Sequence, residues 1–145
     1  MKAIVYCGPP GAGKSYEIKA ANFPEDTPIL DMAKYYKEVE KQYPTLDSYG
    51  AYTERMDRLV NELFTLSRDD EVGTVVIEGI FAPASHSREW LIQACFDYNI
   101  DVNFVAVDFN LEDPVRRITA DYERDHDRKR YLGRLALFSK YADRF

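Results

Sequence analysis

Short apolar runs alternate with stretches of helical periodicity along the chain. Four runs rich in β-branched or aromatic residues are bounded by glycine, proline or polar residues, which is typical of strands. They cover residues 2–7, 27–30, 73–77 and 102–107. The third run is apolar nearly throughout, as expected for a strand that is buried on both faces of a parallel sheet.

Apolar residues recur at helical spacing between and after these runs. The first predicted helix starts near Lys14, and the second carries Met32, Tyr35, Tyr36 and Val39 on one face. The third extends from about Ala51 to Ser67, and its apolar stripe consists of Met56, Leu59, Val60, Leu63 and Phe64. The fourth carries Trp90, Leu91, Ala94, Cys95 and Tyr98. Two more are expected at about 114–124 and 129–141, the first capped by Asp113 before Pro114. This alternation, without a repeat or a linker, predicts one α/β domain over 1–145, with a mostly parallel sheet and helices on both faces.

Composition excludes several classes of protein. The chain has 145 residues, 46% hydrophobic and 30% charged, and no apolar stretch near the roughly 18 residues of a membrane span. Its two cysteines and two histidines lack metal-site spacing and the N-terminus lacks an export signal, so a cytoplasmic location without membrane contact is expected. The net charge of −6 argues mildly against general nucleic-acid binding, although residues 116–134 hold seven bases and four acids.

One motif carries most of the chemistry. Gly8-Pro9-Pro10-Gly11-Ala12-Gly13-Lys14-Ser15 fits the pattern G-x-x-x-x-G-K-[ST] and lies between a predicted strand and a predicted helix, as a phosphate-binding loop requires. Because the two prolines have no N–H group, the backbone donors to phosphate come from the segment 11–15, and the glycines keep the turn free of Cβ atoms. Lys14 is expected to reach the β- and γ-phosphates of ATP, and the Ser15 hydroxyl to bind Mg²⁺.

Two carboxylates follow the second and third strands, at the sheet edge where α/β proteins bind ligands. Glu78 ends an apolar run and is the candidate for the Walker B acid, which holds Mg²⁺ opposite Ser15 directly or through water. An ordinary strand-end carboxylate is the alternative. Asp31 opens the following helix and is a candidate to accept the proton of an attacking hydroxyl, or simply to cap that helix.

A basic segment at about 114–130 is a candidate lid. Spaced as on a single helix, Arg117, Arg124 and Arg128 share a face on which Asp121 also falls, so three guanidinium groups would close over the phosphates of ATP. The alternative is a solvated helix in which Asp121 pairs with the arginines one turn away.

Aromatic residues gather between the second and third strands, where acceptors usually bind. These are Tyr35, Tyr36, Tyr43, Tyr49 and Tyr52. Stacking on a nucleobase and packing of an aromatic core explain the group equally well. His86 and Trp90, beyond Glu78, are further candidates to line an acceptor pocket.

The order of these features resembles the small P-loop kinases. The features are the strand, the GPPGAGKS loop, Asp31, Glu78, the segment Arg88-Glu89-Trp90, the run 104–108 and the arginine-rich helix. They look most similar to the kinase domain of phage-type polynucleotide 5′-hydroxyl kinases. The resemblance implies a three-layer P-loop NTPase fold, ATP and Mg²⁺ bound by Lys14 and Ser15, Asp31 as general base, and Arg117 or Arg124 on the phosphates. Three departures are visible: Glu78 stands for the usual Asp, Asp31 has no Arg or second Asp beside it, and the phosphatase motif of bifunctional relatives is absent.

The sequence therefore predicts an ATP- and Mg²⁺-dependent kinase that transfers the γ-phosphoryl group to a hydroxyl of a polynucleotide, single-stranded or duplex, or of a nucleoside within one. A nucleoside, nucleotide or small-metabolite kinase is the alternative. A nucleoside monophosphate kinase would need an arginine on the acceptor helix, and none stands between Asp31 and Arg55. A P-loop ATPase switch is a second alternative, although the guanine-reading N-K-x-D motif is absent.

Overall fold

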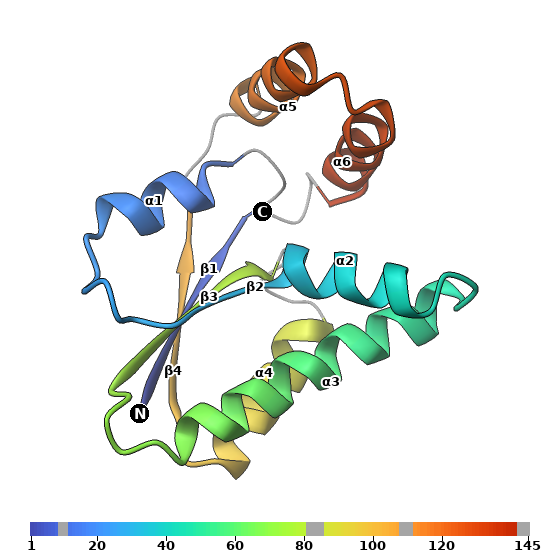
Figure 1. The fold of residues 1–145 in the computed structure, drawn as a ribbon. Helices are drawn as coiled ribbons and strands as arrows, with labels where there is room; N and C mark the ends of the chain where they lie inside the picture. Colours follow the sequence, from blue (N-terminus) through green and yellow to red (C-terminus); the bar gives the residue numbers. More distant parts are fainter. Residues whose placement is uncertain (9–11, 81–85, 108–111, 142–145) are drawn as a thin grey trace.

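A single parallel sheet forms the centre of the molecule (Figure 1). The computed structural model describes residues 1–8, 12–80, 86–107 and 112–141. The strands found there are β1 (Lys2–Cys7), β2 (Ile29–Asp31), β3 (Thr74–Ile80) and β4 (Asp101–Ala106), in the order β2-β3-β1-β4. Because all strand pairs are parallel, their carboxyl ends meet at one edge of the sheet.

Helices connect and follow the strands, as the alternating pattern predicts. They are α1 (Lys14–Ala20), α2 (Met32–Gln42), α3 (Ser48–Ser67), α4 (His86–Asp97), α5 (Glu112–Asp125) and α6 (Arg128–Tyr141). In the described part of the chain, none of them combines the length and the apolar character needed to cross a membrane.

The two faces of the sheet are covered by different helices (Figure 1). Alternate residues of β1, such as Val5, pack with Leu59 of α3 and Leu91 of α4 in the larger core. The intervening Tyr6 packs with Ile18 of α1 in a smaller cluster on the opposite face. Complete burial of a leucine side chain stabilises the fold by about 1.5–3 kcal/mol. Leu59 and Leu91 are completely buried on the α3–α4 face, so this face contributes strongly to the apolar stabilisation.

Some predicted boundaries are wrong by a few residues. The strand predicted at 27–30 is Ile29–Asp31, since these are the residues that pair with β3. Helix α3 begins at Ser48 and not near Ala51, because Asp47 caps it: its Oδ1 accepts a hydrogen bond from the Gly50 N–H at 2.6 Å. Helix α5 begins at Glu112, so Asp113 lies inside the helix and not at its cap.

Two predicted inward-facing positions are also wrong. Tyr36 and Phe64 are 52% and 41% exposed, because the neighbouring Tyr35 and Leu63 take the inward positions on α2 and α3. Tyr98 lies one residue beyond the end of α4 but packs against the larger core, as its spacing predicts. Apolar spacing locates a helix well, but it does not separate the centre of a buried stripe from its margin.

Candidate phosphate-binding and phosphoryl-transfer site

The loop between β1 and α1 holds the side chain of Lys14 inside the protein. Lys14 is 8% exposed, and its Nζ donates a hydrogen bond to the carbonyl oxygen of Gly8 at 2.7 Å. Burial lowers the pKa of Lys14 to about 8, and the carboxylate of Glu78 opposes that shift. Phosphate oxygens bound in the loop would favour the charged form of this ammonium group.

Gly13 allows helix α5 to approach the loop closely. Its φ of 95° lies in the left-handed region that favours glycine, and a Cβ at this position would overlap the guanidinium of Arg117. Arg117 therefore lies against the last residue before α1. Of the other loop residues predicted to bind ATP, Gly8 follows β1 and Ala12 is buried, whereas Gly11 is outside the described residues.

Ser15 and Glu78 meet across the loop. The Ser15 Oγ donates a hydrogen bond to Glu78 Oε1, although 63 positions separate the two residues in the sequence. Hard oxygen donors suit Mg²⁺, which commonly takes one or two protein ligands and completes its shell with phosphate and water. Within the described residues no three His, Cys, Asp or Glu side chains cluster as a metal site of their own. The pair therefore fits Mg²⁺ bound together with a nucleotide.

Gly79 sets the position of Glu78, and sequence reasoning did not include it in the site. Its φ is 106°, and a Cβ there would lie 2.9 Å from the Cβ of Met32. The pairing of β1 with β3 shifts register at this point, so Gly79 is the extra residue of a β-bulge. The Glu-Gly pair at the strand end was the available signal.

Asp31 lies beside Glu78 at the carboxyl edge of the sheet, because the register of β2 and β3 pairs the two residues. Asp31 also caps α2: its Oδ1 accepts a hydrogen bond from the Ala33 N–H at 2.9 Å. The capping role predicted for Asp31 is thus confirmed. Its Oδ2 makes no hydrogen bond to another described residue. Its charge is one of those that oppose the lowering of the Lys14 pKa by burial.

The three lid arginines do not share a face, so this prediction is wrong. Helix α5 ends at Asp125, and the positive φ of His126 turns the chain before α6 begins at Arg128. Arg128 is therefore on a different helix from Arg117. Arg124 is 73% exposed at its side chain and pairs with Asp121 at 3.0 Å, as the solvated-helix alternative predicts.

Arg134 of α6 joins the site instead, and sequence reasoning missed it. Its Nη1 donates a hydrogen bond to Asp121 Oδ2 at 2.7 Å, and this bond lowers the pKa of Asp121. Burial and then the charge of Arg134 lower the pKa of Lys14. Arg117 and Asp121 are one turn apart on α5, so Asp121 holds Arg134 close to Arg117. Only the packing of α6 on α5 shows this.

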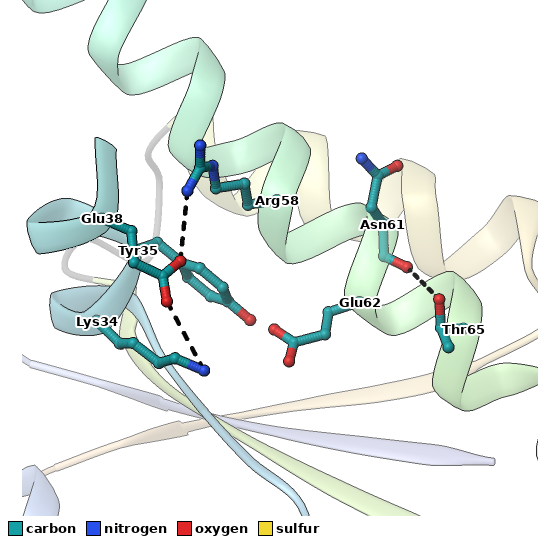
Figure 2. Close-up of a pocket in the computed structure, with 7 residues that line it drawn as sticks. All are labelled: Lys34, Tyr35, Glu38, Arg58, Asn61, Glu62 and Thr65. Atoms are coloured by element: carbon teal, nitrogen blue, oxygen red, sulfur yellow. Dashed lines mark hydrogen bonds and ion pairs between the residues drawn. The ribbon is translucent and has the colours of Figure 1, made fainter. Parts of the chain in front are cut away.

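A cavity of about 340 Å³ lies between α2 and α3 (Figure 2), and none of the site residues described above lines it. Lys34, Tyr35, Glu38, Arg58, Asn61, Glu62 and Thr65 line it. Glu38 pairs there with Arg58 at 3.4 Å and with Lys34 at 3.9 Å (Figure 2). These ion pairs join neighbouring turns and the two helices, so we interpret the cavity as part of the α2–α3 interface.

Comparisons with known proteins identify the fold. No protein-family model matches this sequence, and no curated protein matches it significantly. A candidate kinase from Chloroflexus aurantiacus aligns with a TM-score of 0.66 and 13% identity over 85% of this chain and 68% of that one. A chain of the Pnkp1/Rnl/Hen1 RNA repair complex aligns with a TM-score of 0.65 and 15% identity over 99% and 46% of the respective chains. The APS kinase of Mycobacterium tuberculosis, in complex with AMPPNP and APS, aligns with a TM-score of 0.60 and 24% identity over 86% and 73%. The predicted three-layer P-loop NTPase fold is confirmed.

Proposed function

We propose that this protein is a kinase that uses ATP and Mg²⁺ to phosphorylate a hydroxyl of a nucleic acid. One observation carries the proposal: the loop cation Lys14, the Ser15–Glu78 pair and the carboxylate of Asp31 come together at one edge of the sheet. Cations for the phosphates and a base for the hydroxyl are the parts that phosphoryl transfer requires.

The donor phosphates are held by cations from three parts of the chain. Lys14 exchanges its bond to the Gly8 carbonyl for phosphate oxygens, while Arg117 and Arg134 approach from the lid. Ser15 and Glu78 would hold Mg²⁺, which when bound neutralises charge on the phosphates. Placing these charges before the reaction begins stabilises the negative charge that spreads over the transferred group.

Asp31 serves the acceptor. Its Oδ1 is fixed by the cap of α2, so Oδ2 is the oxygen that accepts the proton of the attacking hydroxyl. The hydroxyl oxygen forms a bond to the γ-phosphorus, the bond from that phosphorus to the β,γ-bridging oxygen breaks, and ADP leaves. Fixing the carboxylate at both the strand end and the helix start supplies the orientation that this step needs.

The nucleic-acid acceptor is supported by two features. Residues 116–134, which span the end of α5 and the start of α6, hold seven bases against four acids, and this local excess would attract a phosphate backbone. The structural likeness to a chain of an RNA repair complex covers 99% of this chain. The likeness to APS kinase keeps a small-molecule acceptor as the competing result.

The test is transfer of label from γ-labelled ATP, with Mg²⁺, to a panel of 5′-hydroxyl DNA and RNA oligonucleotides, nucleosides, nucleotides and small metabolites. Lys14→Ala removes the phosphate cation. Asp31→Asn keeps the capping oxygen of α2, so a loss of activity in this variant reports the base and not the fold.

Label on oligonucleotides that disappears in both variants is the expected result. Label confined to a small molecule would keep the kinase and reject the nucleic acid. Release of phosphate at a rate independent of every acceptor would support an ATPase switch and reject the kinase.

A further inference from the structure

A second cavity lies at the outer end of the α2–α3 hairpin, which extends away from the carboxyl end of β2 (Figure 1). Its volume is about 280 Å³. It is lined by Tyr36, Val39, Glu40, Tyr43, Pro44, Leu46, Asp47, Ser48, Ala51 and Arg55. The mechanism above uses none of these residues.

Two tyrosines and a leucine in the wall of this cavity are exposed to solvent. Tyr36, Tyr43 and Leu46 are 52%, 42% and 43% exposed, and all three line the same space. The guanidinium of Arg55 lies 4.9 Å from the centre of the Tyr36 ring, so the wall includes a cation–π pair. Exposed rings and a planar cation form a surface on which a planar aromatic group stacks.

The polar rim favours a base over a phosphate. Glu40 Oε1 accepts a hydrogen bond from Lys129 of α6 at 2.6 Å, and Asp47 Oδ1 accepts one from the Gly50 N–H at 2.6 Å. Each carboxylate has a second oxygen that can accept from an exocyclic amino group, as Glu and Asp do with cytosine. Arg55 and Lys129 balance the two carboxylates, so the rim has no net positive charge that would favour a phosphate group.

The distance along α2 connects the cavity to the reacting hydroxyl. Tyr36 and Tyr43 follow Asp31 by five and twelve residues, which at the 1.5 Å rise of a helix places them about 8 and 18 Å along the axis. A stacked strand advances about 3.4 Å per nucleotide, so this span corresponds to roughly two to five nucleotides. A free nucleoside or small metabolite bound at Asp31 would not reach the cavity.

We infer that the α2–α3 end cavity binds a nucleobase of a single-stranded acceptor, two to five nucleotides from the hydroxyl that is phosphorylated. The inference rests on the proposed function and names the part of the acceptor that this enzyme recognises. Bases that carry an exocyclic amino group are preferred over thymine or uracil. The Lys129–Glu40 bond places the tip of the lid beside the same cavity.

The experiment compares intact 5′-hydroxyl dodecamers with dodecamers that lack the bases at positions 3–6, which are two to five nucleotides from the 5′ nucleotide, and it uses residues 1–145 of the protein. The variants are Tyr36→Ala, Tyr36→Phe, which keeps the ring, and Tyr49→Ala as a matched control. Tyr49 is on the same hairpin and 75% exposed but does not line the cavity. Steady-state KM and kcat are measured for each oligonucleotide and for a dinucleotide.

Stacking on an aromatic residue contributes about 1–3 kcal/mol per base, so Tyr36→Ala should raise the KM for the intact dodecamer at least about 5-fold with little change in kcat. The oligonucleotide without these bases should show a similar rise with the wild-type protein and no further rise with Tyr36→Ala. Tyr36→Phe, Tyr49→Ala and the dinucleotide should be unaffected. Equal KM values for both dodecamers, or an equal effect of Tyr36→Ala on the dinucleotide, would overturn the inference.

Binding without catalysis separates this inference from the proposed function. Fluorescence anisotropy of a labelled dodecamer with the nucleotide-free protein measures Kd for the same variants. If no oligonucleotide is phosphorylated but Tyr36→Ala weakens binding at least about 5-fold, the subsite stands and the kinase proposal fails. If Tyr36→Ala and the removal of bases leave Kd unchanged, the subsite is rejected whatever the activity.

Discussion

The phosphate loop and the α2–α3 hairpin differ in how their side chains are held. Around the phosphate loop the important groups are tied to the chain: Lys14 is buried on the Gly8 carbonyl, and Ser15 is bonded to Glu78. Along the α2–α3 hairpin the corresponding surface is open, with exposed Tyr36 and Tyr43 around a cavity. A site that binds one invariant nucleotide can use charges that are fixed before binding. A site that selects an acceptor relies on the shape of an open surface.

We expect substitution of the buried Lys14 to have the largest effect on activity. Lys14→Met removes the buried cation while keeping a side chain of similar length, so kcat/KM should fall by about 10²–10³-fold or more. Circular dichroism should show a folded protein, because the substitution replaces a buried charge with an apolar group. Activity within 10-fold of wild type would show that the loop cation does not act on the phosphates.

The lowered pKa of Lys14 makes stability depend on pH in a defined direction. Between about 8 and 10.5 the unfolded chain keeps the proton that the folded protein has released, so the free energy of unfolding rises with pH. Relative to Lys14→Met, urea unfolding of the nucleotide-free wild type should gain about 1–3 kcal/mol over this range. A difference that is flat or falls with pH would contradict the buried position of this ammonium group.

The Ser15–Glu78 pair should control the response to magnesium. Glu78→Gln removes the charge but keeps the size, so the Mg²⁺ concentration that gives half-maximal activity should rise about 10–100-fold. Activity is titrated with Mg²⁺ at saturating ATP. The exposed Glu25→Gln serves as the control and should leave the titration unchanged.

The hydrogen bond between Asp121 and Arg134 can be tested separately from the ion pair between Asp121 and Arg124. Asp121→Asn should reduce kcat by about 10-fold and change KM for the acceptor little, since Arg134 would no longer be held near the transferred phosphate. Arg124→Ala removes only an exposed partner and should be nearly silent. Equal losses in the two variants would mean that Asp121 merely stabilises the lid.

The contact between the lid and the hairpin should have the smallest effect. Lys129→Ala breaks the Lys129–Glu40 pair, but both side chains are exposed to solvent, so stability and rate should change very little. A salt titration of wild type and variant measures the difference, which should vanish at high ionic strength. A loss of more than 10-fold in kcat would make the lid–hairpin contact part of the donor machinery.

The sequence predicted the strand, loop and helix of the proposed donor site because their pattern is local. The loop from Gly8 to Ser15 needs its residues in one fixed order between a strand and a helix, and that order is readable without a structure. Parallel strands also bring their carboxyl ends together by rule, which made Glu78 and Asp31 candidates from their places alone. The shared face predicted for Arg117, Arg124 and Arg128 was wrong because the chain turns at His126 after α5, and apolar periodicity does not show where the next helix packs.

The sequence by itself determined the order of strands and helices, the phosphate loop and the two strand-end carboxylates, since each depends on neighbours a few residues away. Only the tertiary structure decided that Ser15 bonds to Glu78, that Gly79 bulges against Met32, that Arg134 of α6 bonds to Asp121 of α5, and that Tyr36 faces solvent beside a cavity. These outcomes join residues that are distant in the chain or choose between the two sides of one helix. The packing of whole elements against one another sets such choices, and apolar periodicity does not record them.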